Sequence, residues 1–272
     1  MYSLALIIPA AGSSARYQSS GGLRSKLDEM LGDRPVLQRT CEIFSKFDDD
    51  EWTIGPIVVA GPHEESAWQE FREKHADRLA LLGAVLCKGG KTHRYETVQA
   101  ALKHVPANCT HIAVHDAARP CLSHALLTRV LRAARKNPAV IPALRVSDTI
   151  KLTAESDAPK EHDPLAAIFG ESSGPQKQLH VVKTVPRDNL VLVQTPQVFE
   201  ASLLREAYAQ SNLTSTDDAG LVEPLLAKQG KHVVVVDGEA SNIKLTYPED
   251  LALAKNILGL KDDGGRASHK KF

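Results

Sequence analysis

The chain has 272 residues, of which 43% are hydrophobic and 24% are charged. Lysine and arginine together number 33, as do aspartate and glutamate, so the formal net charge is zero. General nucleic-acid binding needs a basic surface, and single-strand binding needs aromatic side chains for stacking. Zero net charge and an aromatic content of 5% exclude these two classes, but they leave room for a small basic pocket that binds an anionic substrate.

The sequence lacks membrane-spanning and secreted character. No segment approaches the run of about 20 apolar residues that a membrane helix needs. The apolar segment Leu4–Pro9 is short and has no basic residues before it, so we interpret it as a buried strand and not as a signal peptide. The four cysteines contain no C-x-x-C pair and are too sparse for a disulfide framework. We therefore expect a reduced, cytoplasmic protein.

Apolar runs alternate along the chain with segments of helical periodicity. The predicted strands are Leu4–Pro9, Ile54–Ala60, Ala84–Cys87, His111–His115, Ala139–Val146, Leu190–Gln194 and His232–Asp237. The predicted helices are Pro35–Phe47, Glu64–Leu81, Glu96–Lys103, Ser123–Lys136, Ala201–Gln210 and Pro248–Leu258. Unbroken Val, Ile and Leu runs suit strands covered on both faces. The alternation predicts an α/β fold with a mainly parallel sheet flanked by helices, and a ligand site at the carboxyl ends of the strands.

Local signals mark helix starts and irregular segments. Ser123 is placed to cap one helix, and Pro248 is followed by two acidic residues in the first turn of another. Residues 154–178 are rich in Ser, Pro, Gly and charge, which predicts a long, mobile loop inserted between two strand-like segments. Residues 261–272 are polar and predict a flexible tail.

Small residues follow the first predicted strand in the segment Pro9-Ala10-Ala11-Gly12-Ser13-Ser14-Ala15-Arg16. Small side chains let backbone N–H groups approach a phosphate closely, and Arg16 adds a charged donor. A dinucleotide-binding fingerprint is disfavoured, because only Gly12 stands where three glycines are needed.

A glycine pair, Gly89-Gly90, follows another predicted strand. It does not complete a phosphate-binding P-loop, because the earlier glycine of that motif is replaced by Val85. The pair precedes Arg94 and Thr97 at the start of a predicted helix, where backbone groups could hold a nucleobase or ribose. A plain tight turn explains the pair equally well.

An aspartate and an arginine follow a third predicted strand in the segment Val114-His115-Asp116-Ala117-Ala118-Arg119-Pro120. A carboxylate at this position can hold Mg²⁺ against a triphosphate. Arg119 can pair with a phosphate or with Asp116, and a purely structural Asp–Arg pair is the alternative interpretation. No second histidine lies at metal-ligand spacing from His115.

Further cations, Arg187 and Lys244, lie near the ends of later strands. Together with Arg16 they make a site rich in positive charge and poor in activated nucleophiles. A reaction without a general base requires an attacking group that is already anionic, such as a phosphate monoester. Positioning and charge neutralisation are what phosphoryl and nucleotidyl transfer need from a protein.

These segments, in this order, resemble the 2-C-methyl-D-erythritol 4-phosphate cytidylyltransferases of the non-mevalonate isoprenoid pathway. The matching segments are IIPAAGSSAR, SKLDEMLGDRPVLQRT, GGKTHRYETV, VHDAARP, RVSDTIK, KTVPRDN, QTPQVF, STDDAGLVEPL and GEASNIKLTYPEDLALA. The resemblance runs from Leu4 to about Leu258 and omits the insertion. It implies a Rossmann-like nucleotidyltransferase domain made of residues 1–145 and 190–260, with residues 146–189 forming an extended β-arm for dimerisation.

The resemblance also implies roles for individual residues. Ala10, Ala11 and Gly12 would wrap CTP, Arg16 and Lys26 would hold its triphosphate, and Gly89, Gly90 and Thr97 would contact cytosine and ribose. Asp116 would bind Mg²⁺, with Arg119 alongside. Thr149, Arg187, Thr195, Thr216 and Lys244 would position the phosphorylated polyol substrate. Because Thr149 and Arg187 lie on the arm, they would serve the site of a second subunit, which makes a homodimer a functional requirement.

Several features depart from the family pattern. Three extra residues lie between Arg16 and Lys26, so Arg24 could compete for the triphosphate. Thr97 stands where serine is usual, Ser241 occupies a commonly acidic position, and the arm is longer. Two alternatives therefore stay open: a ribitol 5-phosphate cytidylyltransferase, and a catalytically silent nucleotide-binding subunit.

Overall fold

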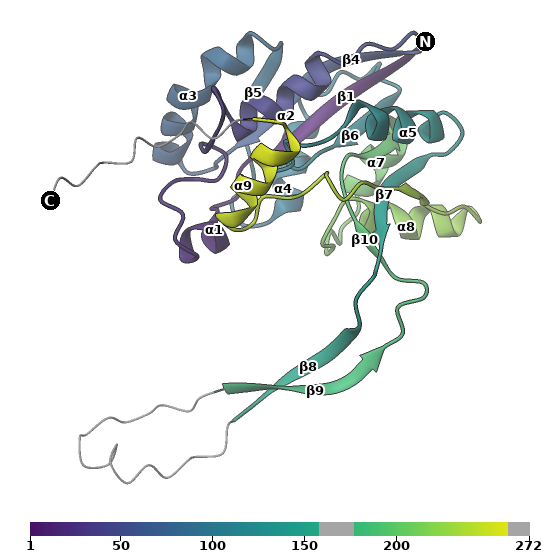
Figure 1. The fold of residues 1–272 in the computed structure, drawn as a ribbon. Helices are drawn as coiled ribbons and strands as arrows, with labels where there is room; N and C mark the ends of the chain where they lie inside the picture. Colours follow the sequence, from purple (N-terminus) through teal and green to yellow (C-terminus); the bar gives the residue numbers. More distant parts are fainter. Residues whose placement is uncertain (158–176, 261–272) are drawn as a thin grey trace, which may run out of the picture. The chain divides into compact units, whose positions relative to one another are not determined.

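The computed structural model describes residues 1–157 and 177–260 (Figure 1). The chain divides into two compact units, each considered by itself. The first comprises Met1–Leu144 and the chain from Val193 onward, and the second comprises Arg145–Leu192. The sequence-based division into residues 1–145 and 190–260, with an arm at 146–189, stays a prediction. The tail at 261–272 lies outside the described residues.

A mostly parallel sheet forms the centre of the first unit. Its strands are β1 (Tyr2–Pro9), β4 (Trp52–Gly61), β5 (Ala84–Lys88), β6 (His111–Val114), β7 (Ala139–Arg145), β11 (Gln197–Glu200) and β12 (Val234–Asp237). They run in the order β7-β11-β6-β1-β4-β5, and β12 also pairs with β7. The antiparallel member is β11, which pairs with β6 on one side and β7 on the other.

Strand β1 is covered on both faces, as its unbroken apolar sequence predicts. Leu4, Leu6 and Ile8 belong to one hydrophobic cluster, whereas Ala5 and Ile7 belong to a second. Alternate side chains of a strand point to opposite faces, so these clusters are the two cores on either side of the sheet.

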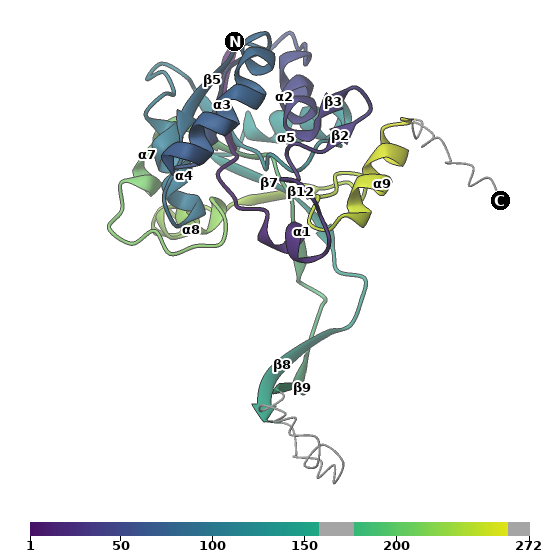
Figure 2. The same cartoon turned by 90° about the vertical axis from the view of Figure 1, so that its left-hand side faces the viewer.

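Helices supply the outer layers of both cores. They are α1 (Ala15–Ser19), α2 (Val36–Ser45), α3 (Glu65–Ala80), α4 (Arg94–Leu102), α5 (His124–Ala134), α7 (Ala201–Tyr208), α8 (Ala219–Lys228) and α9 (Glu249–Ile257). Buried residues of α2, α3, α5 and α9 join the first cluster, and those of α4, α7 and α8 join the second. Figure 2 shows these helices arranged around the sheet strands. The predicted α/β class with a Rossmann-like, mainly parallel sheet is confirmed. No helix among the described residues is long and apolar enough to cross a membrane.

Most predicted elements appear within a few residues of their expected bounds, but α1, α8, β11 and the two-residue strands β2 (Met30–Leu31) and β3 (Arg34–Pro35) were not predicted. Strand β11 spans only Gln197–Glu200, which is too short for a periodic signal. Helix α8 contains Pro224, and proline ordinarily argues against a helix interior. The predicted cap is present, since the Ser123 hydroxyl accepts a hydrogen bond from the Leu126 N–H at 3.0 Å.

The second unit contains an antiparallel pair, β8 (Ile150–Asp157) and β9 (Lys177–Val185), followed by β10 (Val191–Val193). The loop predicted at 154–178 is therefore wrong at both ends, because residues 154–157 and 177–178 are strand. Glu155 and Lys177 pair at 3.0 Å on this exposed ribbon. A ribbon without a core of its own tolerates polar residues, so polarity here did not mean a loop. Residues 158–176 lie outside the described residues.

Replacing Leu6 by alanine tests the two-core arrangement. Leu6 is fully buried in β1 between β4 and β6, so the change leaves a cavity beneath the first layer of helices. We expect a loss of about 2–5 kcal/mol in the free energy of unfolding, measured by urea denaturation. Leu81→Ala, at a side chain that is 88% exposed, is the control and is expected to change the free energy by less than about 0.5 kcal/mol. Equal effects of the two changes would contradict the assignment of β1 to the core.

Candidate active site

A cavity of about 240 Å³ opens at the carboxyl ends of the parallel strands. The segment after β1 contributes Ala10, Ala11 and Gly12, and the segment after β6 contributes Asp116. Lys26, Lys244 and the segment Gly90–Arg94 with Thr97 supply further polar and glycine lining. The cavity thus lies where the fold class places a ligand site.

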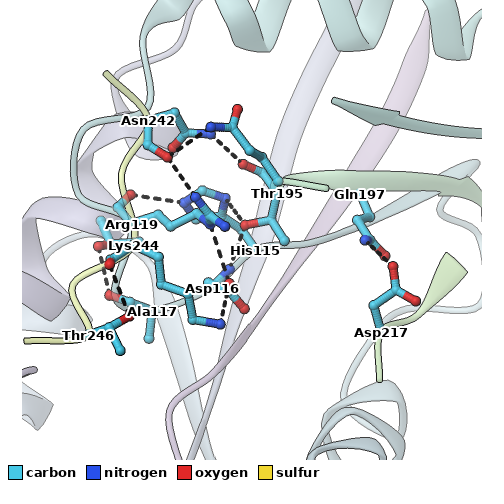
Figure 3. Close-up of polar contacts among 12 residues, drawn as sticks. His115, Asp116, Ala117, Arg119, Thr195, Gln197, Asp217, Asn242, Lys244 and Thr246 are labelled. Carbon is cyan, nitrogen blue, oxygen red and sulfur yellow. Dashed lines mark hydrogen bonds and ion pairs between the residues drawn. The ribbon is translucent and has the colours of Figure 1, made fainter. Parts of the chain in front are cut away.

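Asp116 stands at the centre of a group of cations (Figure 3). Its carboxylate lies 2.9 Å from Lys244 Nζ, 3.4 Å from Arg119 Nε and 4.0 Å from Arg94 Nη2. Burial alone would raise the pKa of Asp116, but Lys244, Arg94 and Arg119 together hold that pKa well below its usual value. Asp116 is therefore ionised at neutral pH.

Buried hydrogen bonds hold the chain segments that carry Asp116 and Lys244. Arg119 Nη1 donates to the Asn242 carbonyl at 2.6 Å, and Asn242 Nδ2 donates to the Thr195 carbonyl at 2.9 Å. The Asp116 N–H donates to Thr195 Oγ1 at 3.0 Å. Arg119 and Thr195 thus lie behind the cavity wall, where each fixes neighbouring backbone.

His115 also belongs to this buried framework. Its Nε2 lies 3.1 Å from the Arg119 carbonyl, and its Nδ1 lies 3.1 Å from Thr195 Oγ1. Phe44 packs against its ring edge-to-face at 5.2 Å. Burial lowers the pKa of His115 to about 4, so the ring is neutral at pH 7 and both nitrogens are used within the protein.

Lys26 brings a further cation to the cavity. Burial lowers the pKa of Lys26, and the nearby charges of Lys244 and Arg16 lower it further, whereas Asp116 acts in the opposite direction. The ammonium groups of Lys26 and Lys244 therefore repel one another across the cavity. An anion placed between them would relieve that repulsion.

The glycine pair makes a tight turn that also faces the cavity. A Cβ at Gly89 would lie 2.7 Å from the Gly61 carbonyl oxygen, and one at Gly90 would lie 2.1 Å from Glu96 Cβ. The Gly90 N–H donates to Thr97 Oγ1 at 3.1 Å. The two glycines are required by close packing, and Gly90 and Thr97 line the cavity as well.

Arg94 lines the cavity, although no role was assigned to it in the sequence analysis. Its Nη2 lies 2.7 Å from Asp218 Oδ2, and Asp218 is fully buried. Tyr208 donates its hydroxyl proton to Asp218 Oδ1 at 2.6 Å. Burial alone would lower the pKa of Arg94, but the Asp218 charge raises it overall. No local pattern in the sequence connects Arg94 with Asp218, so sequence reasoning missed the role of Arg94.

The structure brings together most, but not all, of the residues singled out in the sequence. Those lining the cavity are Ala10, Ala11, Gly12, Lys26, Gly90, Thr97, Asp116 and Lys244. Arg16, Arg24 and Thr216 are exposed and do not line it. Thr149 and Arg187 belong to the second unit, where Arg187 Nη1 donates to the Ser147 carbonyl.

Known proteins share both the sequence and the fold of this chain. A family model described as 2-C-methyl-D-erythritol 4-phosphate cytidylyltransferase matches residues 4–160 and 173–260. The chain belongs to this family. The resemblance found in the sequence is therefore confirmed.

Individual relatives are similar over nearly their whole length. The 2-C-methyl-D-erythritol 4-phosphate cytidylyltransferase of Bacillus cereus is 34% identical over 256 residues, which cover 93% of this chain and 96% of the relative. That of Frankia casuarinae is 36% identical over 262 residues, covering 95% and 82%. The crystal structure of the Thermus thermophilus cytidylyltransferase superposes with a TM-score of 0.63 at 31% identity, covering 96% of this chain and all of that one (100%).

Asp116 is the candidate ligand of this chain for a divalent cation. Among residues 1–157 and 177–260, no group of three or more His, Cys, Asp or Glu side chains is placed to hold a metal. Mg²⁺ is commonly bound by one or two carboxylates together with substrate phosphates. The ionised Asp116 carboxylate, facing the cavity, fits that mode. The residues present therefore fit Mg²⁺ in company with a phosphate ligand.

The buried His115 predicts a pH-dependent stability. The pKa of His115 is about 4 in the folded chain against 6.5 for an ordinary histidine. As the pH falls, the unfolded chain therefore takes up a proton at this residue at a higher pH than the folded chain does. The contribution of His115 is complete above pH 6.5 and is lost as the pH falls towards 4. Between pH 7 and pH 4.5 we expect the stability advantage of the parent chain over His115→Gln to shrink by about 2 kcal/mol, measured by urea unfolding. An advantage that does not change with pH would contradict a neutral, buried His115.

Proposed function

We propose that this chain is a cytidylyltransferase that acts on CTP and 2-C-methyl-D-erythritol 4-phosphate. Its products are 4-diphosphocytidyl-2-C-methyl-D-erythritol and pyrophosphate. The observation that carries the proposal is the cluster of Lys26, Lys244 and Arg94 around the ionised Asp116, in a cavity edged by small residues. Membership of the cytidylyltransferase family supplies the identity of the two substrates.

The proposed reaction is an in-line attack by a phosphate oxygen of the acceptor on the α-phosphorus of CTP. The bond from that phosphorus to the bridging oxygen of pyrophosphate breaks, and pyrophosphate leaves with the electron pair. The attacking oxygen is already anionic, so no protein group has to remove a proton. His115 fits this account, because both of its nitrogens are engaged within the protein.

Neutralising charge is the main task of the protein in such a reaction. We assign Lys26 to the triphosphate, and Lys244 to the α-phosphate of CTP and to the acceptor phosphate that attacks it, since both lysines line the cavity and repel one another until an anion arrives. Arg16 is exposed on α1 and is assigned to the outer part of the triphosphate. Asp116 would hold Mg²⁺ together with the phosphates, and the ion would supply further charge neutralisation when bound.

The nucleoside is assigned to the glycine side of the cavity. Ala10, Ala11 and Gly12 leave space for the nucleotide beside the end of β1, and a Cβ at Gly12 would meet nothing within 4 Å. Gly89, Gly90 and Thr97 are assigned to cytosine and ribose. Arg119 and Thr195 support the phosphate side from behind, and Thr216 is assigned to the acceptor.

We also propose that the chain works as a homodimer in the cytoplasm. Strands β8 and β9 expose apolar side chains that a partner can cover, including Leu152 at 47%, Leu179 at 66% and Val181 at 57%. Thr149 and Arg187 of each arm are assigned to the partner's acceptor site. The four cysteines are buried and free, as expected in a reducing compartment.

Pyrophosphate release tests the proposed activity directly. With CTP and Mg²⁺, we expect release that depends on 2-C-methyl-D-erythritol 4-phosphate, because the acceptor phosphate is the nucleophile. Release with ribitol 5-phosphate alone would keep the mechanism and change the acceptor. CTP binding without release in the presence of either acceptor would contradict the activity and favour a silent nucleotide-binding subunit.

Mixing two strongly impaired variants tests the shared site. If Arg187 serves the partner, a dimer of one Arg187→Ala chain and one Lys26→Ala chain has one intact site and one doubly defective site. Random exchange of subunits would then restore about a quarter of the parent activity, because half of the dimers are mixed. Pyrophosphate release after co-refolding measures this, with each variant refolded alone as the control. No recovery would mean that each chain builds its own site.

A further inference from the structure

The turn that carries Lys26, residues 26–29, is attached both to α2 and to α3. Leu27 is buried in the first hydrophobic cluster, and its carbonyl accepts a hydrogen bond from the Leu37 N–H at 3.2 Å. The Glu29 carbonyl accepts one from the Val36 N–H at 2.9 Å. These contacts attach the turn to α2, which lies after it in the chain.

A second attachment joins the turn to α3, nearly fifty residues away. Asp28 Oδ1 lies 2.9 Å from His75 Nε2, and Asp28 Oδ2 lies 2.8 Å from Lys74 Nζ. The His75 side chain is 3% exposed and that of Asp28 is 16% exposed, so water screens the contact little. Each carboxylate oxygen has its own partner on α3, which fixes the orientation of Asp28 as well as its position.

The attachment matters because Lys26 is placed where other cations repel it. Lys26 is partly withdrawn from water and lies near Lys244 and Arg16, and all three effects disfavour its charged form. Asp116 attracts Lys26 but is already paired with Lys244 at 2.9 Å. A turn free to move would carry the Lys26 ammonium away from this cluster and towards water. The two contacts of Asp28 oppose that movement.

We infer that Asp28, through its contacts with His75 and Lys74, is a positioning residue for Lys26 in the nucleotidyl-transfer reaction. The inference rests on the proposed function, since it requires Lys26 to act on the triphosphate. Asp28 itself is directed at α3 and does not line the cavity. Its effect on the reaction therefore passes entirely through the placement of Lys26.

Asp28→Asn is the variant of choice, because it removes the charge and nearly preserves the size of the side chain. A small displacement of a catalytic group can cost a large factor in rate, and we expect kcat/KM for CTP to fall about tenfold. The matched control is Glu70→Gln, which removes the other carboxylate bound to Lys74, at 2.6 Å, and leaves Asp28 in place. The control is expected to keep the parent kcat/KM.

Combining Asp28→Asn with Lys26→Ala separates positioning from a general structural role. If Asp28 acts through Lys26, then Asp28→Asn lowers kcat/KM in the parent but changes it less than about twofold when Lys26 is already alanine. A role in stability alone would give the same factor in both backgrounds. Equal factors, or no effect of Asp28→Asn in the parent, would overturn the inference.

Two further measurements keep the result interpretable. Should Asp28→Asn fail to fold, as judged by its thermal unfolding, His75→Gln takes its place in the same double-mutant cycle, because it removes the contact from the α3 side. A parent chain that releases no pyrophosphate would contradict the proposed function. If the parent is active and its Asp28→Asn and His75→Gln variants are as active as the parent, this inference is contradicted and the proposed function is not.

Discussion

A buried carboxylate can stay ionised only if cations surround it, and this constraint organises the first unit. Asp116 forms ion pairs with three cations: Lys244 from the segment before α9, Arg119 from its own loop, and Arg94 from the start of α4. Lys26, Lys244, Arg119 and Arg94 outnumber the carboxylates Asp116 and Asp218, so this region has an excess of positive charge. A polyanion such as a nucleoside triphosphate is the ligand that balances it.

The sheet makes this gathering possible. Parallel strands end at one edge, so the segments after β1 and β6 meet although more than a hundred residues separate them in sequence. The two cores on either side hold β1 rigidly, and the short antiparallel β11 brings Thr195 beside Asp116. The hydrogen bonds among Thr195, Asn242 and Arg119 then fix the segment that ends in Lys244.

Periodicity was sufficient to predict the α/β class and most strands and helices. The resemblance to the cytidylyltransferase family singled out eight residues that line the cavity. Elements that break local rules were beyond prediction, as α8 with its internal Pro224 illustrates. The positions of Arg94 and Asp28 could not be predicted, because each depends on a tertiary partner, Asp218 or His75, that no local pattern connects with it. Arg119 was correctly recognised as a candidate partner of Asp116, but its bond to the Asn242 carbonyl is visible only in three dimensions.

A crystal structure of the chain with CTP and Mg²⁺ tests the central claim most directly. The account predicts that the triphosphate lies between Gly12 and the ammonium groups of Lys26 and Lys244, with Mg²⁺ on Asp116 and the cytosine near Gly90. A nucleotide bound away from this cavity, or one bound here with Lys26 and Lys244 turned away from its phosphates, would contradict it.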